Sequence, residues 1–319
     1  MTVVVTGASG FVGRELVARL LGLESWSVRL VSHSQSFVNC ATNNATVHIV
    51  ENFSDPAQWA EVLRGADVLV HLAGRAHVLK ESVAQPEIEF NRVNVEFTGV
   101  LARAAATQGI KRMIFVSSIG VNGLQSETGK KHSEASPPRP ENAYTRSKWT
   151  AEQLLMDVAN STGIEVVIVR PPLVYGASAP GNFGALIRAI AKSWPLPLGA
   201  VNNLRSLVSL ENLVDFLILC MNHPRAANQT FLVSDGRDIS TTWLVRFLAN
   251  AMCVKVRIFP VPLFILRFAG RLLGRTSAVQ GLCGSLQVDI SKARNVLGWS
   301  PPVSVEEGLR RAVAGITKP

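Results

Sequence analysis

A tyrosine and a lysine four residues apart are the side chains best suited to proton transfer, in the stretch Tyr144-Thr145-Arg146-Ser147-Lys148. On a helix, such a pair lies on one face. A free phenol has a pKa of about 10 and is a poor base at neutral pH, but a neighbouring ammonium group favours the phenolate and lowers that pKa. The pair could therefore exchange a proton with a hydroxyl or carbonyl group. The alternative is a surface helix with an accidental spacing, although the chain has only two tyrosines.

Three glycines near the N-terminus form a second group with chemical meaning. Gly7, Gly10 and Gly13 follow an apolar strand pattern and open a helical one. There, Gly7 permits a tight turn, Gly10 lets the backbone approach a pyrophosphate, and Gly13 lets the helix pack on the strand. The free N–H groups of the helix N-terminus then face the phosphates. We predict a dinucleotide site here; the alternative is a flexible turn with chance glycines.

The elements that must hold these groups alternate along the first half of the chain. Near-continuous apolar runs predict buried strands, and they lie at 3–7, 27–32, 47–52, 67–74, 112–118 and 165–172. Helical patterns lie between them, at 11–23, 56–65, 88–108 and 144–162. This alternation predicts an α/β fold, a doubly wound parallel sheet of the Rossmann type.

After Pro171-Pro172 the pattern changes, with frequent Pro and Gly and short strands. We therefore expect a dinucleotide-binding domain at 1–172, with 205–222 returning to it. A smaller C-terminal substrate-binding domain takes 173–204 and 223–319.

Composition sets the outer limits. The chain of 319 residues is 47% hydrophobic and 17% charged, which indicates a core-rich globular protein. We see no run of about 18 apolar residues and no signal peptide, and expect a cytoplasmic protein. The cysteines form no CxxC pair and have no His at ligand spacing, so we predict reduced thiols and no metal site; they are Cys40, Cys220, Cys253 and Cys283. The charge of +9 is spread out, without interleaved aromatics, which argues against nucleic acid.

The TGxxGxxG spacing together with the YxxxK stretch resembles the extended short-chain dehydrogenase/reductase superfamily, in particular its UDP-glucose/UDP-galactose 4-epimerase branch. The resemblance implies that Tyr144 is the acid/base and that Lys148 tunes it. Of the two serines that end the 112–118 run, it makes Ser118 the residue that orients the reacting oxygen, with Ser117 as the alternative. Asn94 would kink its helix or hold a water linked to Lys148, or else be an ordinary helix-face residue. The sequence departs from the family at Asn122, where a Tyr is usual.

The resemblance also implies a nicotinamide dinucleotide. NAD-specific relatives carry an acid after the second strand to hold the ribose 2′-hydroxyl. This chain has Ser32 and His33 there and no carboxylate, so we expect NADP in preference to NAD. Asn52 and Phe53 align with the family's adenine-contacting pair. The residues expected to contact the cofactor are Gly7, Ser9, Gly10, Phe11, Val12, Ser32, His33, Asn52, Phe53, Leu72, Ala73, Gly74, Tyr144, Lys148 and Pro171.

On the substrate side, Asn182 and Phe183 align with the family's nucleotide-sugar loop, and Arg205 with an arginine that clamps a phosphate. The family's Arg-x-x-Asp pair is missing from the stretch AVQGLCGSLQVD, and Arg275 is the candidate replacement. Ala76 stands where the epimerases place a lysine. Ser118 would also contact the substrate.

These features and the resemblance predict an enzyme acting at C4 of a nucleotide sugar, and the resemblance implies that the nucleotide is UDP. Our first expectation is a UDP-4-keto-sugar reductase of the UDP-N-acetylquinovosamine type, since the chain resembles bacterial O-antigen reductases. The alternatives are a UDP-glucose or UDP-N-acetylglucosamine 4-epimerase and a non-catalytic NADP-sensing protein. A homodimer and a weak membrane-surface contact are the other partners considered.

The membrane contact comes from residues 259–277, which have a helical pattern from Leu263 onward. In it Arg267, Arg271 and Arg275 recur every four residues. One interpretation is a lid helix with its apolar face packed and its arginines in water. A second has Arg275 reaching the nucleotide diphosphate. The third is a helix lying on anionic lipid.

Overall fold

The computed structural model describes residues 1–23, 25–32, 44–76, 85–127, 129–274 and 276–316. Seven parallel strands form one sheet in the order β3-β2-β1-β4-β5-β6-β9. Their bounds are Thr2–Thr6 (β1), Ser27–Ser32 (β2), Ala45–Ile49 (β3), Val68–His71 (β4), Arg112–Val116 (β5), Glu165–Arg170 (β6) and Gln229–Leu232 (β9). The strand order reverses between β1 and β4, which is where doubly wound folds bind ligands. The predicted Rossmann-type sheet is confirmed.

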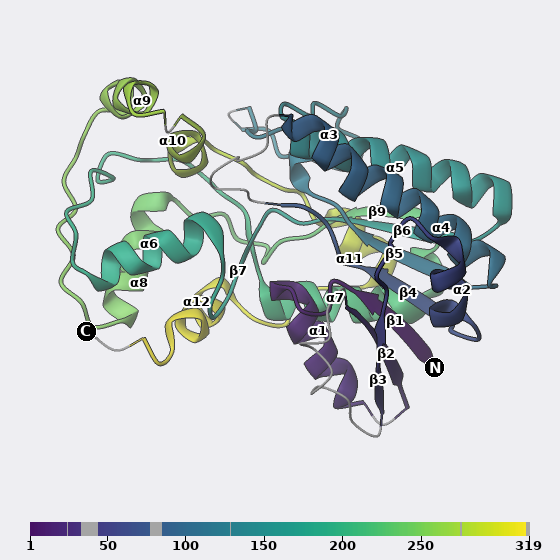
Figure 1. Ribbon diagram of the computed structural model, residues 1–319. Helices are drawn as coiled ribbons and strands as arrows, with labels where there is room; N and C mark the ends of the chain where they lie inside the picture. Colours follow the sequence, from purple (N-terminus) through teal and green to yellow (C-terminus); the bar gives the residue numbers. More distant parts are fainter. Residues whose placement is uncertain (24, 33–43, 77–84, 128, 275, 317–319) are drawn as a thin grey trace.

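Helices cover both faces of this sheet (Figure 1). On one face lie α1 (Phe11–Leu21), α7 (Leu210–Asn222) and α11 (Ser291–Leu297); on the other lie α2 (Pro56–Leu63), α4 (Phe97–Thr107) and α5 (Ala143–Thr162). Alternate β1 side chains enter the two layers, because successive strand residues point to opposite faces. Val3 and Val5 pack beneath α1 and α7, and Val4 packs beneath α2 and α4.

The helix predicted over 88–108 is continuous but not uniform. It consists of α3 (Pro86–Asn91), a π-helical turn η2 (Arg92–Glu96) and then α4. Such turns insert an extra residue into a helix and often occur at functional sites. Here the turn carries Asn94.

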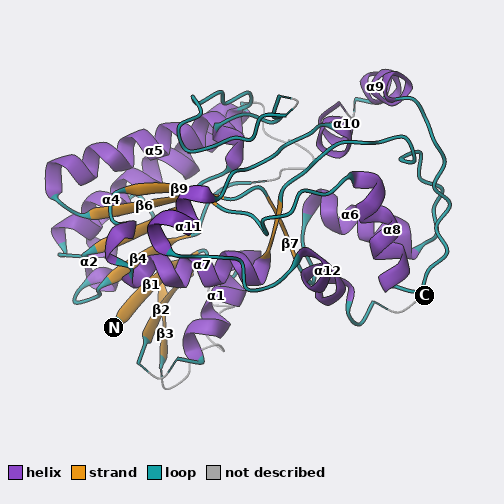
Figure 2. Cartoon of the chain, turned by 180° about the vertical axis from the view of Figure 1, so that it is seen from behind, coloured by secondary structure: helices purple, strands orange, loops and turns teal. Residues whose placement is uncertain are grey.

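A smaller part lies beside the carboxyl ends of the strands (Figure 2). It has a parallel pair, β7 (Leu173–Tyr175) and β8 (Leu207–Ser209), and the helices α6 (Gly181–Ala191), α8 (Thr241–Ala251), α9 (Leu263–Leu272), α10 (Thr276–Cys283) and α12 (Val305–Val313). Two short 3-10 turns complete the chain, η3 (Ile119–Val121) and η4 (Pro224–Ala226). The strand β9 belongs to the large sheet, although it follows residue 222.

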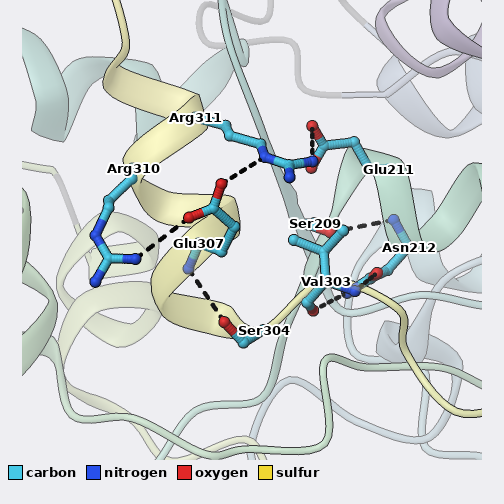
Figure 3. Close-up of polar contacts among 8 residues, drawn as sticks. All are labelled: Ser209, Glu211, Asn212, Val303, Ser304, Glu307, Arg310 and Arg311. Atoms are coloured by element: carbon cyan, nitrogen blue, oxygen red, sulfur yellow. Dashed lines mark hydrogen bonds and ion pairs between the residues drawn. The ribbon is translucent and has the colours of Figure 1, made fainter.

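The last helix ties the two parts together (Figure 3). Asn212, at the start of α7, donates to the Val303 carbonyl oxygen at 2.8 Å and accepts from the Val303 N–H at 2.9 Å. Ser304 caps α12 by accepting from the Glu307 N–H at 3.3 Å. Arg311 on α12 pairs with Glu211 on α7. These contacts fix the C-terminal segment against the β8–α7 junction.

Candidate active site

The glycine loop between β1 and α1 has the geometry of a phosphate cradle. Gly7 has φ +70°, and a Cβ there would lie 2.6 Å from the Ala73 nitrogen. A Cβ on Gly13 would lie 2.2 Å from the Gly7 oxygen, so no larger residue fits either position. Gly10 precedes α1 without any side-chain cap, which leaves first-turn N–H groups for a ligand. The loop therefore fits a dinucleotide pyrophosphate.

Ser9, Phe11 and Val12 belong to the same loop. Ser9 is exposed, and its carbonyl oxygen accepts from Arg14 Nε at 2.9 Å. Val12 packs against the core beneath α1. Phe11 instead reaches the smaller part, where a Cβ on Gly176 would lie 3.3 Å from its ring. The loop thus touches both parts of the protein.

The expected adenine side is only partly described. Ser32 ends β2, and its carbonyl oxygen accepts from the Val50 N–H at 3.1 Å. Asn52 is exposed and caps its own turn through the Ser54 N–H. Phe53 stacks on Phe97 with ring centres 4.7 Å apart. His33 lies outside the described residues, so its expected contact stays a prediction.

His71 is a buried residue whose role the sequence analysis did not assign. Its ring nitrogens lie 2.7 Å from Thr6 Oγ1 and 2.9 Å from Thr98 Oγ1. Burial, and then the charge of Lys148, lower the His71 pKa to about 3, so the ring is neutral near pH 7. This imidazole clamps β4 to β1 and α4 and so positions Leu72, Ala73 and Gly74. The Leu72 N–H donates to the Thr6 carbonyl oxygen at 3.2 Å.

Asn94 and Lys148 meet at Gly74. A Cβ on Gly74 would lie 3.1 Å from Asn94 Oδ1 and 3.3 Å from Lys148 Nζ. Asn94 accepts from the Arg75 N–H at 2.8 Å and donates to Ser147 Oγ at 2.9 Å. Its amide therefore links the loop after β4 to α5, where Tyr144 and Lys148 lie.

Lys148 is buried at the end of β5. Its ammonium group donates to the Val116 carbonyl oxygen at 3.0 Å and lies 4.5 Å from the centre of the Phe115 ring. Burial lowers its pKa to about 8, while the Glu152 carboxylate acts in the opposite direction. The lysine is therefore close to its titration point at physiological pH.

Tyr144 on α5 and Ser118, which follows the carboxyl end of β5, lie next to each other. Burial raises the Tyr144 pKa to about 12, and a side-chain hydrogen bond with Ser118 lowers it in part. The ammonium group of Lys148 is directed to the Val116 carbonyl and the Phe115 ring. The expected lowering of the Tyr144 pKa by Lys148 together with an oxidised nicotinamide stays a prediction.

Ser117 points the other way. It is buried and donates its hydroxyl proton to Glu152, while Ser118 caps η3 by accepting from the Gly120 N–H at 3.1 Å. Neighbouring strand residues face opposite sides, so only one serine can face Tyr144. Pro171, expected beside the cofactor, is buried, and its carbonyl oxygen accepts from the Ile119 N–H at 3.0 Å.

A buried ion pair behind Ser117 was not predicted. Arg170 Nε donates to Glu152 Oε1 at 3.0 Å, and Arg170 Nη1 donates to Asn122 Oδ1 at 3.0 Å. Asn122, the departure from the family pattern, thus braces an arginine. Two signals could have revealed the pair: Glu152 lies one helical turn after Lys148, and Arg170 ends an apolar strand.

Three of the expected substrate residues line one cavity of about 80 Å³ between α6, α8 and α10. Arg205, Asn182 and Phe183 all contribute to it. Arg205 donates to the Gly284 carbonyl oxygen at 2.9 Å, and burial lowers its pKa to about 10. Among the described residues, no carboxylate pairs with it, so this guanidinium suits an anionic ligand.

Not every residue of this group is equally exposed. Phe183 is buried against Tyr175, with ring centres 5.5 Å apart, whereas Asn182 is exposed at the start of α6. Arg275 lies outside the described residues, so its contact with the diphosphate stays a prediction.

Fold and site together define the class: the chain is an extended short-chain dehydrogenase/reductase. Residues 3–234 match the model of the NAD dependent epimerase/dehydratase family. The protein belongs to that family.

Three similarities extend over almost the whole chain. A UDP-glucose 4-epimerase of Vibrio cholerae is 40% identical, over 97% of this chain and 94% of its own length. An N-acetyl-alpha-D-glucosaminyl-diphospho-ditrans,octacis-undecaprenol 4-epimerase of Escherichia coli O157:H7 is 26% identical, over 98% and 94%. The crystal structure of UDP-glucose 4-epimerase with UDP-glucose from Thermotoga maritima has a TM-score of 0.79 at 24% identity, covering 98% of this chain and 97% of that one. This last likeness confirms the fold.

Among the described residues, no helix has the length and apolar character to cross a bilayer.

Proposed function

We propose that this enzyme interconverts the two C4 epimers of a nucleotide sugar. The observation that carries the proposal is the hydrogen bond of Tyr144 to Ser118, just beyond the carboxyl end of β5, on the helix whose Lys148 lies beside Gly74. The 40% identity to a UDP-glucose 4-epimerase supports C4 of the sugar as the reacting carbon. The sequence alone favoured a 4-keto reductase. We now place epimerisation first because of this relative.

In this proposal Ser118 holds the C4 oxygen and Tyr144 exchanges its proton. Lys148 supplies positive charge one helical turn after Tyr144, and Asn94 fixes the loop that carries Gly74. When bound, the nicotinamide accepts and returns the hydride and, in its oxidised form, adds positive charge near the phenol. Because burial raises the Tyr144 pKa to about 12, the phenol is protonated near pH 7 in the chain by itself.

The cofactor contacts follow the glycine loop. We propose that Gly7, Gly10 and the first turn of α1 hold the pyrophosphate, and that Asn52 and Phe53 lie near the adenine. The described end of β2 offers Ser32 and no carboxylate, which supports NADP over NAD.

The substrate contacts lie in the smaller part. We propose that Arg205 clamps the diphosphate and that Asn182 at the start of α6 assists it. The dinucleotide-binding part would comprise 1–172 and 205–222, together with β9, and the rest would bind substrate. The cytoplasmic location and the homodimer stay proposals.

A 4-keto reductase is the second candidate, favoured by the missing carboxylate after β2. A reductase releases its cofactor oxidised in each cycle and commonly draws on NADPH, whereas an epimerase regenerates its cofactor in place. Both begin with the same residues, so a direct measurement must separate them.

The test is to incubate purified enzyme with UDP-glucose or UDP-N-acetylglucosamine, without added nicotinamide, and to follow the C4 epimer by NMR. Epimer formation, with NAD or NADP in the denatured extract, is the expected result. Oxidation of added NADPH by a UDP-4-keto sugar, with no epimer formed, would establish the reductase instead. Binding of NADPH without either reaction would indicate a sensing protein and overturn the proposal.

The diphosphate need not carry a nucleoside. The Escherichia coli relative is named for a lipid-linked diphospho-sugar, and Arg205 recognises only the diphosphate in our proposal. Running the same assay with polyprenyl-diphosphate N-acetylglucosamine in detergent would show which carrier is accepted.

A further inference from the structure

The helix α9 presents an apolar face to water. Phe264 is 71% exposed, Phe268 is 64% exposed and Leu272 is 72% exposed. They follow one another at intervals of four, so they form one stripe along the helix. Ile265 is also exposed and widens it. Large apolar side chains that gather on an exposed face mark an interaction site.

The opposite side of α9 does pack. Leu263 and Leu266 contact the core cluster of the smaller part, and Gly270 is buried. Of the apolar residues of the helix, these are the ones packed as a lid helix would require. The stripe of Phe264, Phe268 and Leu272 is a second apolar face that the fold leaves uncovered. In both overall views α9 lies at the outer edge of the molecule, beyond α10 (Figures 1 and 2).

The charged residues on α9 and in the chain on both sides of it have a single sign. Arg267 and Arg271 are exposed and lie on the helix between the stripe and the packed side. From residue 239 to residue 288 the chain has six Lys or Arg and no Asp or Glu. A partner for this face must therefore accept aromatic side chains and carry negative charge.

We propose that the α9 face, Phe264, Phe268 and Leu272 flanked by Arg267 and Arg271, docks on the surface of an anionic lipid bilayer. A helix that lies in a membrane interface buries an apolar face among the acyl chains and keeps basic residues at the headgroups. Anionic lipids attract each such residue. A second copy fits less well, because isologous pairing of this face would bring the arginines of both copies together.

Docking would hold the substrate cavity near the bilayer. α9 packs against α10, and Gly281 and Leu282 of α10 line the cavity that contains Arg205. The proposal does not depend on the chemistry proposed above, because lipid binding is measured without substrate.

The test is flotation of the full-length protein with vesicles of phosphatidylcholine alone or mixed with phosphatidylglycerol. Wild type should float with the anionic vesicles at low salt and only weakly with the neutral ones. The triple variant Phe264→Ser, Phe268→Ser, Leu272→Ser should stay in solution. Arg267→Gln with Arg271→Gln should bind roughly thirtyfold more weakly.

A matched control is needed because the whole chain carries a charge of +9. Arg19→Gln with Arg103→Gln removes the same charge from exposed positions on α1 and α4 and should float like wild type. Circular dichroism and activity on soluble sugar nucleotide should be unchanged in every variant, because the altered side chains lie on the surface.

Three results would overturn the proposal. Wild type could remain in solution with anionic vesicles at low salt. The control pair could lose binding as much as the α9 pair, which would show non-specific attraction. Light scattering could reveal a dimer that the triple variant dissociates, which would assign the face to a second copy.

Discussion

The Glu152 carboxylate and the Arg170 guanidinium form an ion pair inside the protein, with Nε and Oε1 3.0 Å apart and both side chains almost fully excluded from water. Glu152 lies one helical turn beyond Lys148 on α5 and accepts a hydrogen bond from the Ser117 hydroxyl group. It therefore braces the strand end that presents Ser118.

Glu152→Ala should destabilise the protein by about 3–5 kcal/mol, because it leaves a buried arginine without its counter-charge. Urea unfolding measures the loss. Glu127→Ala is the control, since Glu127 forms an exposed pair with Lys130 and should cost no more than about 1 kcal/mol. Equal losses in the two variants would show that the buried pair contributes nothing particular to the fold.

Tyr144→Phe should lower kcat about a thousandfold while NADPH binding, followed by fluorescence, is retained, because only the exchanged proton is removed. The other tyrosine gives a matched control. Tyr175 donates to the buried Asp235 at 2.7 Å, so Tyr175→Phe should lower stability by about 1–3 kcal/mol and keep most of kcat. A Tyr144→Phe enzyme with near-normal turnover would assign proton transfer to another residue.

Arg205→Ala should raise the KM for the sugar substrate roughly tenfold to a hundredfold, since a charge-assisted contact to the diphosphate is worth about 1.5–3 kcal/mol. Titration calorimetry should show unchanged dinucleotide binding. Arg188→Ala, an exposed position on α6, should leave KM unchanged. If the dinucleotide and the sugar substrate are weakened equally by Arg205→Ala, the arginine serves the structure through Gly284 and not the substrate.

Asp235 should make stability depend on pH. Burial raises its pKa to about 6 in the folded protein, against 3.8 for the free side chain. A raised pKa gives stability that is complete below pH 4 and is lost as the pH rises through about 6. Asp235→Asn cannot titrate, so the stability of wild type relative to this variant should fall by up to about 3 kcal/mol between pH 4 and pH 8. Urea unfolding of both proteins across that range measures it, and parallel pH profiles would contradict it.

Local patterns in the sequence were enough to predict the sheet, the glycine loop and the Tyr144–Lys148 pair. Strand and helix periodicity, the turn that Gly7 needs and the i, i+4 spacing are all properties of short segments. Periodicity did not predict β9, because four residues at an edge carry little signal. The family resemblance suggested a kink at Asn94, but the π turn itself depends on the contacts with Arg75 and Ser147.

Only the tertiary structure decided which way particular side chains point. Two adjacent serines are equal in the sequence, but the buried Glu152–Arg170 pair takes Ser117 and leaves Ser118 to Tyr144. Likewise, the periodicity of 259–277 shows an amphipathic helix without saying which apolar face packs. The core contacts of Leu263 and Leu266 settle that question and leave Phe264 and Phe268 in water. The direction of each of these side chains depends on segments that are distant in the sequence, because packing between elements sets a side chain's partners.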